Sequence, residues 1–300
     1  MGAVGGRRIV GSNPLTTDYL LRSRPGLWRG ALPASRPSAI ILPEMASRHQ
    51  RPGATGSRPE NVAARAPDGT RVYAVGDIHG RADLLRSLHR KILDDAADSE
   101  AHRKVVVYVG DYVDRGPDSF GVVDMLIEDP LPGFERHHLK GNHEDFLLRF
   151  LETGSHGEVW MMNGARTTLE SYGVEWSDMA YGADGLAAAR QRFAGFMPES
   201  HLRFFQRLEL RHQEGDYLFV HAGIRPGVPL DEQRAFDLMW IREAFLDSVA
   251  DHGVVIVHGH TIAPEPEVRP NRIGIDTGAF HSGRLTALVV EGAGRRFLAT

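Results

Sequence analysis

The sequence predicts an α/β fold in which two sheets pack face to face between helices. Short apolar runs of strand length recur along the chain, and each ends in glycine and polar residues. Segments with apolar residues at helical spacing follow the first three of these runs, which is the order of a layered α/β core. In the second half of the chain the apolar runs become more frequent, and a second sheet accommodates them.

Composition excludes several classes of protein. A formal net charge of -4 argues against a general nucleic-acid-binding protein, and no apolar run approaches the length of a membrane span. There is no cysteine, which fits a reducing, cytoplasmic location and excludes disulfides, thiolate metal ligands and cysteine-phosphatase chemistry. No Gly-Lys-Ser/Thr sequence is present, so a P-loop nucleotide site is excluded too.

Residues 1–66 are predicted to be a disordered leader rich in Arg, Gly and Pro. Ten Arg against three acidic residues give this segment a charge of +7, so the remaining residues carry -11. One interpretation is an organelle transit peptide. The other is that translation starts at Met45 and the preceding residues are an artefact of gene calling. We favour the second, because no amphipathic helix can be drawn through the segment. Residues 67–300 then form the folded domain.

The first half of this domain alternates strands with helices. β-Branched and aromatic runs indicate the strands, and apolar residues every three or four positions indicate the helices. Pro117 is well placed to open the second helix. In chain order we expect a strand over 72–75, a helix over 81–93, a strand over 105–109, a helix over 118–128 and a strand over 137–140.

Residues from about 145 to 212 are predicted to form a helical insertion that covers the sheet edge, where substrates would be selected. Phe146 and Phe150 lie on one face of its first helix, and Pro198 begins another helix. Trp160 is expected to pack in the core rather than to form the lip of a pocket. Further strands are expected over 217–220, 254–257, 272–275 and 285–290.

Polar side chains follow five of these strands. The carboxyl ends of strands are where α/β sheets bind ligands. A single buried histidine is usually structural, but the same pattern at five strand ends indicates a site. Nitrogen and oxygen donors suit Mn, Fe or Zn, and two such ions need a bridging carboxylate and several ligands each. The donors are Asp77, His79, Asp111, Asn142, His143, His221 and His260.

These motifs carry a family resemblance. Gly-Asp-x-His-Gly, Gly-Asp-x-Val-Asp-Arg-Gly, Gly-Asn-His-Glu, His-Ala-Gly and Gly-His-Thr occur in that order between about 71 and 291. Together they resemble the phosphoprotein phosphatase branch of the calcineurin-like metallophosphoesterases. The resemblance implies a β-sandwich flanked by helices, with metals at the strand ends. The eukaryotic Ser-Ala-Pro-Asn-Tyr stretch is replaced by Asp276-Thr277-Gly278-Ala279, so the chain looks closer to bacterial serine/threonine protein phosphatases.

The resemblance also implies roles. Asp77 and His79 would bind the first metal, Asp111 would bridge, and Asn142, His221 and His260 would bind the second. His143 would donate a proton to the leaving group with Asp114 orienting it, and Arg115, Asn142 and Arg242 would hold the phosphate. The cofactors would be two divalent ions, with manganese favoured and iron or zinc as alternatives.

The function implied is hydrolysis of phosphate monoesters, first of all phosphoserine and phosphothreonine in proteins, by a hydroxide that bridges the metals. Two cations lower the pKa of a bridging water enough to supply that hydroxide. Hydrolysis of a dinucleoside polyphosphate such as diadenosine tetraphosphate is the alternative, because those enzymes share the metal motifs. A non-catalytic metal-binding scaffold is a third interpretation, but it would not need His143, Asp114, Arg115 and Arg242. The expected partner is a phosphorylated protein or a small phosphoester, without nucleic acid or membrane.

Overall fold

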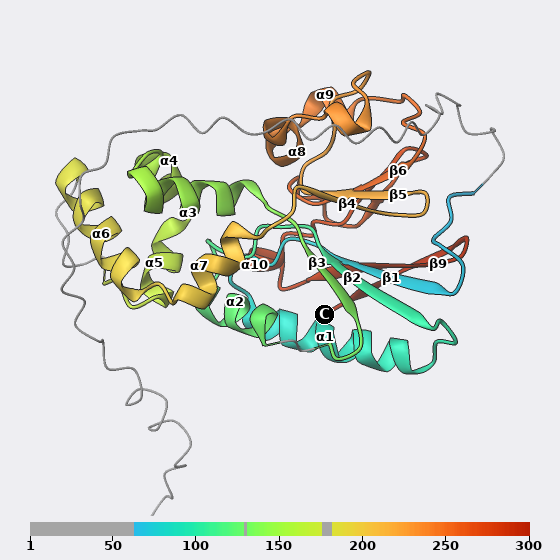
Figure 1. The fold of residues 1–300 in the computed structure, drawn as a ribbon, viewed down its shortest axis with the longest axis horizontal. Helices are drawn as coiled ribbons and strands as arrows, with labels where there is room; N and C mark the ends of the chain where they lie inside the picture. Colours follow the sequence, from blue (N-terminus) through green and yellow to red (C-terminus); the bar gives the residue numbers. More distant parts are fainter. Residues whose placement is uncertain (1–62, 129–130, 176–181) are drawn as a thin grey trace, which may run out of the picture. The chain divides into compact units, whose positions relative to one another are not determined.

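The computed structural model describes residues 63–128, 131–175 and 182–300 (Figure 1). Two five-stranded sheets confirm the predicted α/β class. The first sheet has the order β10-β9-β1-β2-β3, with strands Gly294–Ala299, Thr286–Glu291, Thr70–Val75, Arg103–Tyr108 and Glu135–His138. The second has the order β4-β5-β6-β8-β7, with strands Arg211–Glu214, Tyr217–Val220, Val255–His258, Arg272–Gly274 and Glu267–Val268.

Successive side chains along the strands of the first sheet point to opposite faces, so the sheet has a separate hydrophobic core on each face. Val72 pairs with Val105, and both face the second sheet, where they pack with residues such as Phe219. Tyr73 and Val106 point the other way, into the core beneath the helices. These helices are α1 (Ala82–Ala97) and α2 (Ser119–Ile127), which lie along the lower face in Figure 1. The predicted packing of sheet on sheet between helices follows from this alternation.

The outer face of the second sheet is covered by two short helices that the sequence analysis did not predict. Helices α8 (Ala235–Trp240) and α9 (Glu243–Leu246) lie above β5 and β6 in Figure 1. Leu238 and Phe245 pack there against Val220. Both helices are too short to show a helical period in the sequence. The remaining short elements of this half are a 3₁₀ helix (Leu230–Glu232) and α10 (Ala279–Ser282).

The region from 145 to 212 is mainly helical, as predicted, but its bounds differ. Its first helix begins at Asn142, directly after the strand end, and β4 already begins at Arg211. In Figure 1 the helices of this region gather at one end of the sheets. They are α3 (Asn142–Thr153), α4 (Gly157–Met162), α5 (Ala165–Ser171), α6 (Ala183–Phe196) and α7 (Glu199–Gln206).

The hairpin strand β10 was also not predicted. Its residues read Gly-Arg-Arg-Phe-Leu-Ala, and the first three of these residues are exposed. It lies at the edge of the sheet and pairs only with β9. An edge strand buries little of its surface, so its apolar alternation is weak.

The expected boundary between leader and domain at residue 67 is too late. Ala64 and Ala66 are buried and pack in the core between the sheets. The Arg65 amide donates to Asp216 Oδ2 at 2.9 Å, and the Ala66 amide donates to the Gly292 carbonyl at 2.9 Å. The packed domain therefore includes residues 64–66. The earlier part of the predicted leader, residues 1–62, lies outside the described residues.

A chain that starts at Pro67 is expected to be less stable than one that starts at Asn61. The shorter chain loses the burial of Ala64 and Ala66 and their backbone hydrogen bonds, which together contribute about 1–3 kcal/mol. Urea unfolding of the two chains measures the difference. Both should hydrolyse a small aryl phosphate at the same rate, because these contacts involve none of the predicted site residues. Equal unfolding midpoints would contradict the new boundary.

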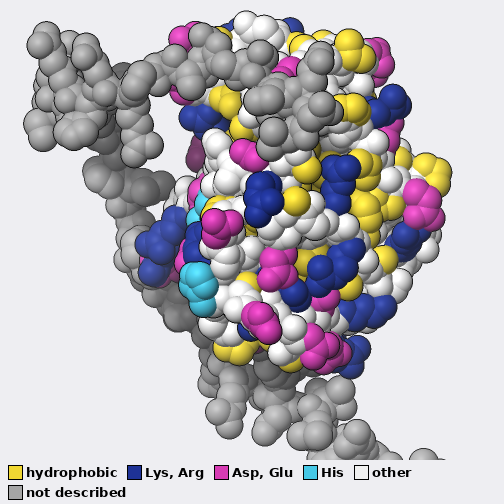
Figure 2. Space-filling model, turned by 90° about the vertical axis from the view of Figure 1, so that its right-hand side faces the viewer, with side chains coloured by type: hydrophobic (Ala, Val, Ile, Leu, Met, Phe, Trp, Pro, Cys, Tyr) yellow, Lys and Arg dark blue, Asp and Glu magenta, His cyan; other side chains and the backbone are white. Residues whose placement is uncertain are grey.

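Basic and acidic side chains are interspersed on the face shown in Figure 2, with hydrophobic side chains between them. The described residues on that face therefore form no continuous basic patch. Among the described residues, no helix combines the length and the apolar character that crossing a bilayer requires.

Candidate metal centre

The predicted donors come together at the carboxyl ends of strands from both sheets. Asp111, after β2, lies at the centre. Its Oδ2 is 3.5 Å from His79 Nε2 and 3.8 Å from His143 Nε2, and its Oδ1 is 3.4 Å from His221 Nε2. All of the predicted donors are buried. Because parallel strands end at the same sheet edge, motifs far apart in the sequence meet here.

Two groups of potential metal ligands share Asp111. One comprises His79, Asp111 and His143, and the other Asp111, His221 and His260; within each group the ligand atoms lie within 4.8 Å of one another. Asn142 joins the second group, since its Oδ1 is 2.9 Å from His221 Nε2. Two adjoining groups around one carboxylate have the form of a dinuclear site.

The histidines are oriented by hydrogen bonds on the side away from the centre. His79 Nδ1 lies 2.7 Å from the Val113 carbonyl, and His221 Nδ1 lies 2.9 Å from the Val109 carbonyl. A carbonyl can only accept, so each Nδ1 carries the proton and each Nε2 presents a lone pair to the centre. This is the tautomer in which a histidine binds a metal.

Asp77 lies beside these groups rather than within them. Its Oδ2 accepts from the His260 amide at 3.0 Å. Its Oδ1 and His260 Nε2 are buried, and neither has a hydrogen-bond partner in the described part of the chain. Unpaired buried polar atoms are costly, and both of these are of kinds that bind divalent ions.

Negative charge is in excess in this region. Asp276, which the sequence analysis did not select, is buried after β8. Burial raises the pKa of Asp276 to about 6, and the charge of Asp111 adds to the effect. Burial also raises the pKa of Asp77, helped by the charges of Asp276 and Asp111. Bound cations would neutralise this charge, so the residues present fit the divalent ions that the sequence predicts.

His143 and Asp114 form a buried pair. His143 Nδ1 is 2.6 Å from Asp114 Oδ2, which also accepts from Trp160 Nε1 at 2.7 Å. Asp114 Oδ1 accepts from the Thr168 hydroxyl at 2.6 Å. Burial lowers the pKa of His143, but the charge of Asp111 and the hydrogen bond and charge of Asp114 outweigh it and raise the pKa. The pair therefore favours a protonated imidazole at the edge of the centre.

Trp160 is a buried core residue, as predicted, and it also contacts the His143–Asp114 pair. Its side chain is fully buried, which confirms the expectation of a core residue. Its indole N–H, together with the Thr168 hydroxyl, also fixes the Asp114 carboxylate. Both come from the helical insertion, on α4 and α5. No pattern in the sequence indicates that these helices contact the loop after β2, which carries Asp114 and Arg115.

Glu144 fixes the two loops that carry the donors. Its Oε2 accepts from the amides of Asp111 and Gly141, each at 2.9 Å, and its Oε1 accepts from the Tyr112 amide at 2.8 Å. Burial raises the pKa of Glu144 to about 7, and the charge of Asp111 contributes to the rise. One side chain thus ties the loop after β2 to the start of α3.

The backbone is strained at this site. Six non-glycine residues in the described part of the chain have a left-handed φ, and five of them are predicted site residues. Such conformations cost of order 1 kcal/mol each and persist where the surroundings impose them. Gly141 and Gly259 relieve crowding, since a Cβ would overlap the carboxylate of Asp111 at the first and of Asp77 at the second. The five site residues are His79, Asp111, Asp114, Arg115 and His260.

The two predicted arginines lie in different positions. Arg115 Nη1 is 3.0 Å from His79 Nε2 and its Nη2 is 3.1 Å from His143 Nε2, with its guanidinium above the Phe280 ring. Binding of a metal by His79 Nε2 therefore requires the Arg115 guanidinium to move. Arg242 is exposed and donates to Thr261 Oγ1 at 3.4 Å.

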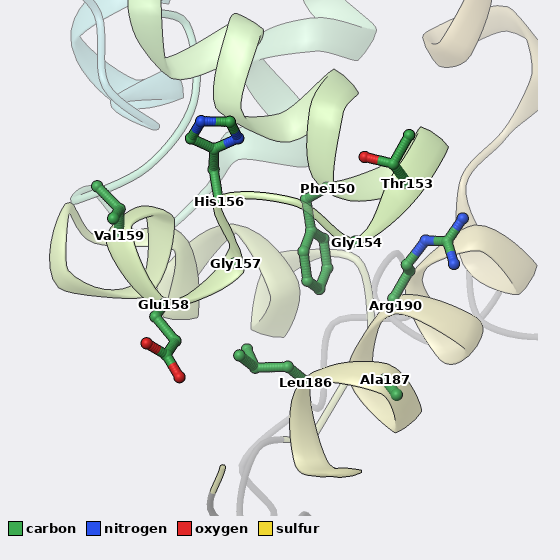
Figure 3. Close-up of a pocket in the computed structure, with 10 residues that line it drawn as sticks. All are labelled: Phe150, Thr153, Gly154, His156, Gly157, Glu158, Val159, Leu186, Ala187 and Arg190. Atoms are coloured by element: carbon green, nitrogen blue, oxygen red, sulfur yellow. The ribbon is translucent and has the colours of Figure 1, made fainter. Parts of the chain in front are cut away.

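A surface cavity of about 440 Å³ lies apart from these donors. It opens between α3, α4 and α6, and in Figure 3 Glu158 and Arg190 stand on opposite sides of it. Phe150 and Leu186 supply apolar lining. None of the predicted site residues lines this cavity, so its size does not make it the site of the chemistry.

Two sheets between helices, with a cluster of nitrogen and oxygen donors at their strand ends, form a site suited to metal-dependent hydrolysis. The sequence profile of the calcineurin-like phosphoesterases matches residues 70–281. The chain belongs to the calcineurin-like phosphoesterase family, whose members use a dinuclear metal site.

A protein phosphatase and a nucleotide phosphatase are among the similar proteins. Serine/threonine-protein phosphatase 1 of Salmonella typhimurium is 30% identical over 248 residues, which cover 78% of this chain and 99% of that protein. Bis(5'-nucleosyl)-tetraphosphatase PrpE of Bacillus thuringiensis is 27% identical over 71% of this chain and 88% of that protein. A crystal structure provisionally assigned as a diadenosine tetraphosphatase superposes with a TM-score of 0.51. It is 23% identical and covers 80% of this chain and 95% of that one, and it supports the fold alone.

Proposed function

We propose that this chain is a protein phosphatase that hydrolyses phosphoserine and phosphothreonine with two divalent ions. The observation that carries the proposal is the His143–Asp114 pair, with Nδ1 and Oδ2 2.6 Å apart, set beside two ligand groups that share Asp111. A metal-binding protein without activity would not need a buried imidazole oriented by a carboxylate next to the metals.

The metal ligands in this proposal are those that the sequence predicts. Two bound ions would supply Lewis acidity and an ionised water at neutral pH. Manganese is the favoured ion and iron or zinc the alternatives, because every donor is a nitrogen or an oxygen. Asp77 and His79 would hold one ion and Asp111 both, and the second would be held by Asn142, His221 and His260.

His143 acts as the proton donor to the leaving group. Asp114 accepts from Nδ1–H, and Nε2, which in this structure accepts from Arg115 Nη2 at 3.1 Å, would carry the second proton of the imidazolium when Arg115 turns to the phosphate. A serine or threonine alkoxide is a poor leaving group, and protonation of its oxygen assists departure. Asp114 is a positioning residue, because it acts through His143.

Arg115, Arg242 and the Asn142 amide would bind the phosphate oxygens. A guanidinium group can donate two parallel hydrogen bonds to a phosphoryl group. Arg115 has its guanidinium within 3.1 Å of His143 Nε2, so it can bind the same phosphate whose ester oxygen His143 protonates. Arg242 contributes from the exposed side. Burial lowers the pKa of His221 and His260, and the charge of Arg242 adds a smaller effect in the same direction.

Hydrolysis of dinucleoside polyphosphates is the second candidate. The similarity to PrpE over 71% of this chain supports it, and the ligand groups suit either substrate. Turnover of a phosphoserine peptide and of diadenosine tetraphosphate by the same manganese-loaded preparation separates the two. The proposal expects kcat/KM at least about tenfold higher for the peptide, which is a difference of about 1.4 kcal/mol in transition-state binding. The opposite ratio would favour the second candidate, and no turnover of either substrate by metal-loaded protein would favour the scaffold.

Removal of metal is expected to abolish activity. Dialysis against a chelator should lower turnover of para-nitrophenyl phosphate to background, and manganese should restore it, because the single charge of Arg115 beside His143 cannot supply the ionised water that two divalent ions would provide. Metal content by mass spectrometry and rate are measured on the same samples. Full turnover at a metal content near zero would rule out the proposed chemistry.

A further inference from the structure

The helical insertion holds the loop after β2 at two consecutive residues. Side chains of the insertion contact the Asp114 carboxylate, and the Arg115 amide donates to the Gly164 carbonyl at 3.2 Å. Gly164 lies in the turn between α4 and α5, with a φ of 100°. A Cβ at Gly164 would crowd the backbone and the side chain of Arg115, so the turn can approach the loop this closely only because the residue is glycine. The insertion therefore contacts both the partner of the proposed proton donor and a proposed phosphate-binding residue.

Thr168, on α5, closes a ring of hydrogen bonds with Asp114. Its hydroxyl donates to Asp114 Oδ1 at 2.6 Å and accepts from the Asp114 amide at 2.8 Å. The Ser119 hydroxyl lies 2.9 Å from the Thr168 hydroxyl and 3.1 Å from the same amide. All three residues are fully buried, so water does not compete for these hydrogen bonds. One side chain of the insertion thus fixes both the backbone and the carboxylate of Asp114.

Trp160, on α4, holds the carboxylate oxygen that faces the proton donor. Its Nε1–H donates at 2.7 Å to Asp114 Oδ2, the oxygen that lies 2.6 Å from His143 Nδ1. The indole packs against the rings of Phe150 and Phe193, with centroids 5.1 and 5.9 Å away. Close packing among buried aromatic rings keeps the indole from turning, so the direction of its N–H is fixed. The position of Oδ2, and with it the orientation of the imidazole, is therefore set by α4.

The backbone at Asp114 and Arg115 needs such support because it is strained. The φ values of these two residues are 71° and 66°, and conformations of this kind persist only where the surroundings impose them. Without the contacts from the insertion, the Asp114 carboxylate could turn about its side-chain bonds, and His143 would lose its orientation. A displacement of about 1 Å in a catalytic group can lower a rate by about 10²-fold.

We propose that Trp160 and Thr168 are positioning residues for proton transfer, which act on His143 through Asp114. The inference rests on the proposed function, because it requires His143 to be the proton donor. It gives the helical insertion a role in the reaction besides covering the sheet edge. Hydrolysis of esters whose leaving group must be protonated, such as phosphoserine, depends on these two contacts, whereas hydrolysis of para-nitrophenyl phosphate does not.

Trp160→Phe tests the inference, since it keeps an aromatic ring in the core and removes the N–H. The kcat for a phosphoserine peptide is expected to fall roughly 10- to 100-fold, the range that corresponds to one hydrogen bond to a charged group. The kcat for para-nitrophenyl phosphate and the KM of both substrates should stay within about threefold of wild type, because Trp160 acts only through Asp114. Metal content, measured by mass spectrometry, should be unchanged.

Phe193→Leu is the matched control. It removes packing beside the indole but no hydrogen bond, because Phe193 contacts Trp160 only through its ring. It should lower the midpoint of urea unfolding and leave the ratio of the two rates as in wild type.

Thr168→Val and Thr168→Ser form a second pair of variants. Valine has the shape of threonine without the hydroxyl, and serine keeps the hydroxyl. We expect Thr168→Val to show the same selective loss on the phosphoserine peptide and Thr168→Ser to restore the wild-type ratio of rates. This pair decides the question if Trp160→Phe does not fold.

Equal losses on the two substrates, or no loss on either, in folded variants would overturn the proposal and leave Trp160 and Thr168 as packing residues. His143→Asn, measured beside them, separates this result from a failure of the proposed function. A selective loss in His143→Asn without one in Trp160→Phe or Thr168→Val would remove the positioning role alone. Equal losses on the two substrates in His143→Asn would remove the proton donor and the positioning role together.

Discussion

Replacing His143 by Asn is expected to lower turnover of a phosphoserine peptide by roughly 10²- to 10⁴-fold, the usual contribution of general acid catalysis. The loss on para-nitrophenyl phosphate should be much smaller, because nitrophenolate leaves without protonation. The physical basis is the geometry of His143. Its Nδ1 is held by Asp114 at 2.6 Å, and its Nε2 lies at the edge of the centre, 3.8 Å from Asp111 Oδ2.

The competing possibility is that His143 is itself a metal ligand, since it groups with His79 and Asp111. Metal content therefore has to be measured with both rates. Asp77→Asn is the matched comparison, because it should weaken the first metal and slow both substrates alike. Loss of a metal from His143→Asn, or equal losses on the two substrates, would show that His143 is not the proton donor.

Replacing Asp111 by Asn should lower turnover of every phosphoester, para-nitrophenyl phosphate included, by at least about 10³-fold. Its two oxygens face opposite ligand groups, with Oδ1 toward His221 and Oδ2 toward His79. Burial raises the pKa of Asp111, but the surrounding histidines, His221 first, lower it overall, so the native group is an anion. The amide that replaces the Asp111 carboxylate has the same shape but no charge, so both ligand groups would bind their metal ions more weakly. The several kcal/mol by which the metal charge stabilises the transition state would then be lost.

Both metals should be depleted in Asp111→Asn, whereas replacement of a residue that binds only one metal, such as Asp77→Asn, should deplete that metal alone. Asp231→Asn, at an exposed aspartate in the short 3₁₀ helix, is the control for purification and metal loading. Unfolding curves establish that both variants are folded. A fully loaded Asp111→Asn, or one that keeps a tenth of wild-type activity, would contradict the bridging role.

The sequence alone determined the fold class, the strands that carry the site and the kinds of donors that gather there. This was possible because β-branched runs such as 105–109 have the same meaning in any buried parallel strand. Polar residues such as Asp77 and Asp111 follow two neighbouring strands, and parallel strands end at a common edge. Local pattern was therefore sufficient to place both in one site.

Only the tertiary structure decided which residues from distant segments complete that site. Trp160 and Thr168 reach Asp114 across 46 and 54 positions of sequence, and Asp276 reaches the region of Asp77 from the other sheet. The periodic spacing of apolar residues predicts which side chains are buried, but it does not predict which residues they contact.

The same limit applies at the edges of the domain. Ala64 and Ala66 belong to no periodic segment, yet they are buried because Asp216 and Gly292 accept hydrogen bonds from the backbone beside them. His137 and His212 are unremarkable within their own strands and meet only because the two sheet edges join at Glu209. The residue types follow from the sequence, whereas distances between segments are set by the packing of whole sheets and helices, a property of no single stretch of the chain.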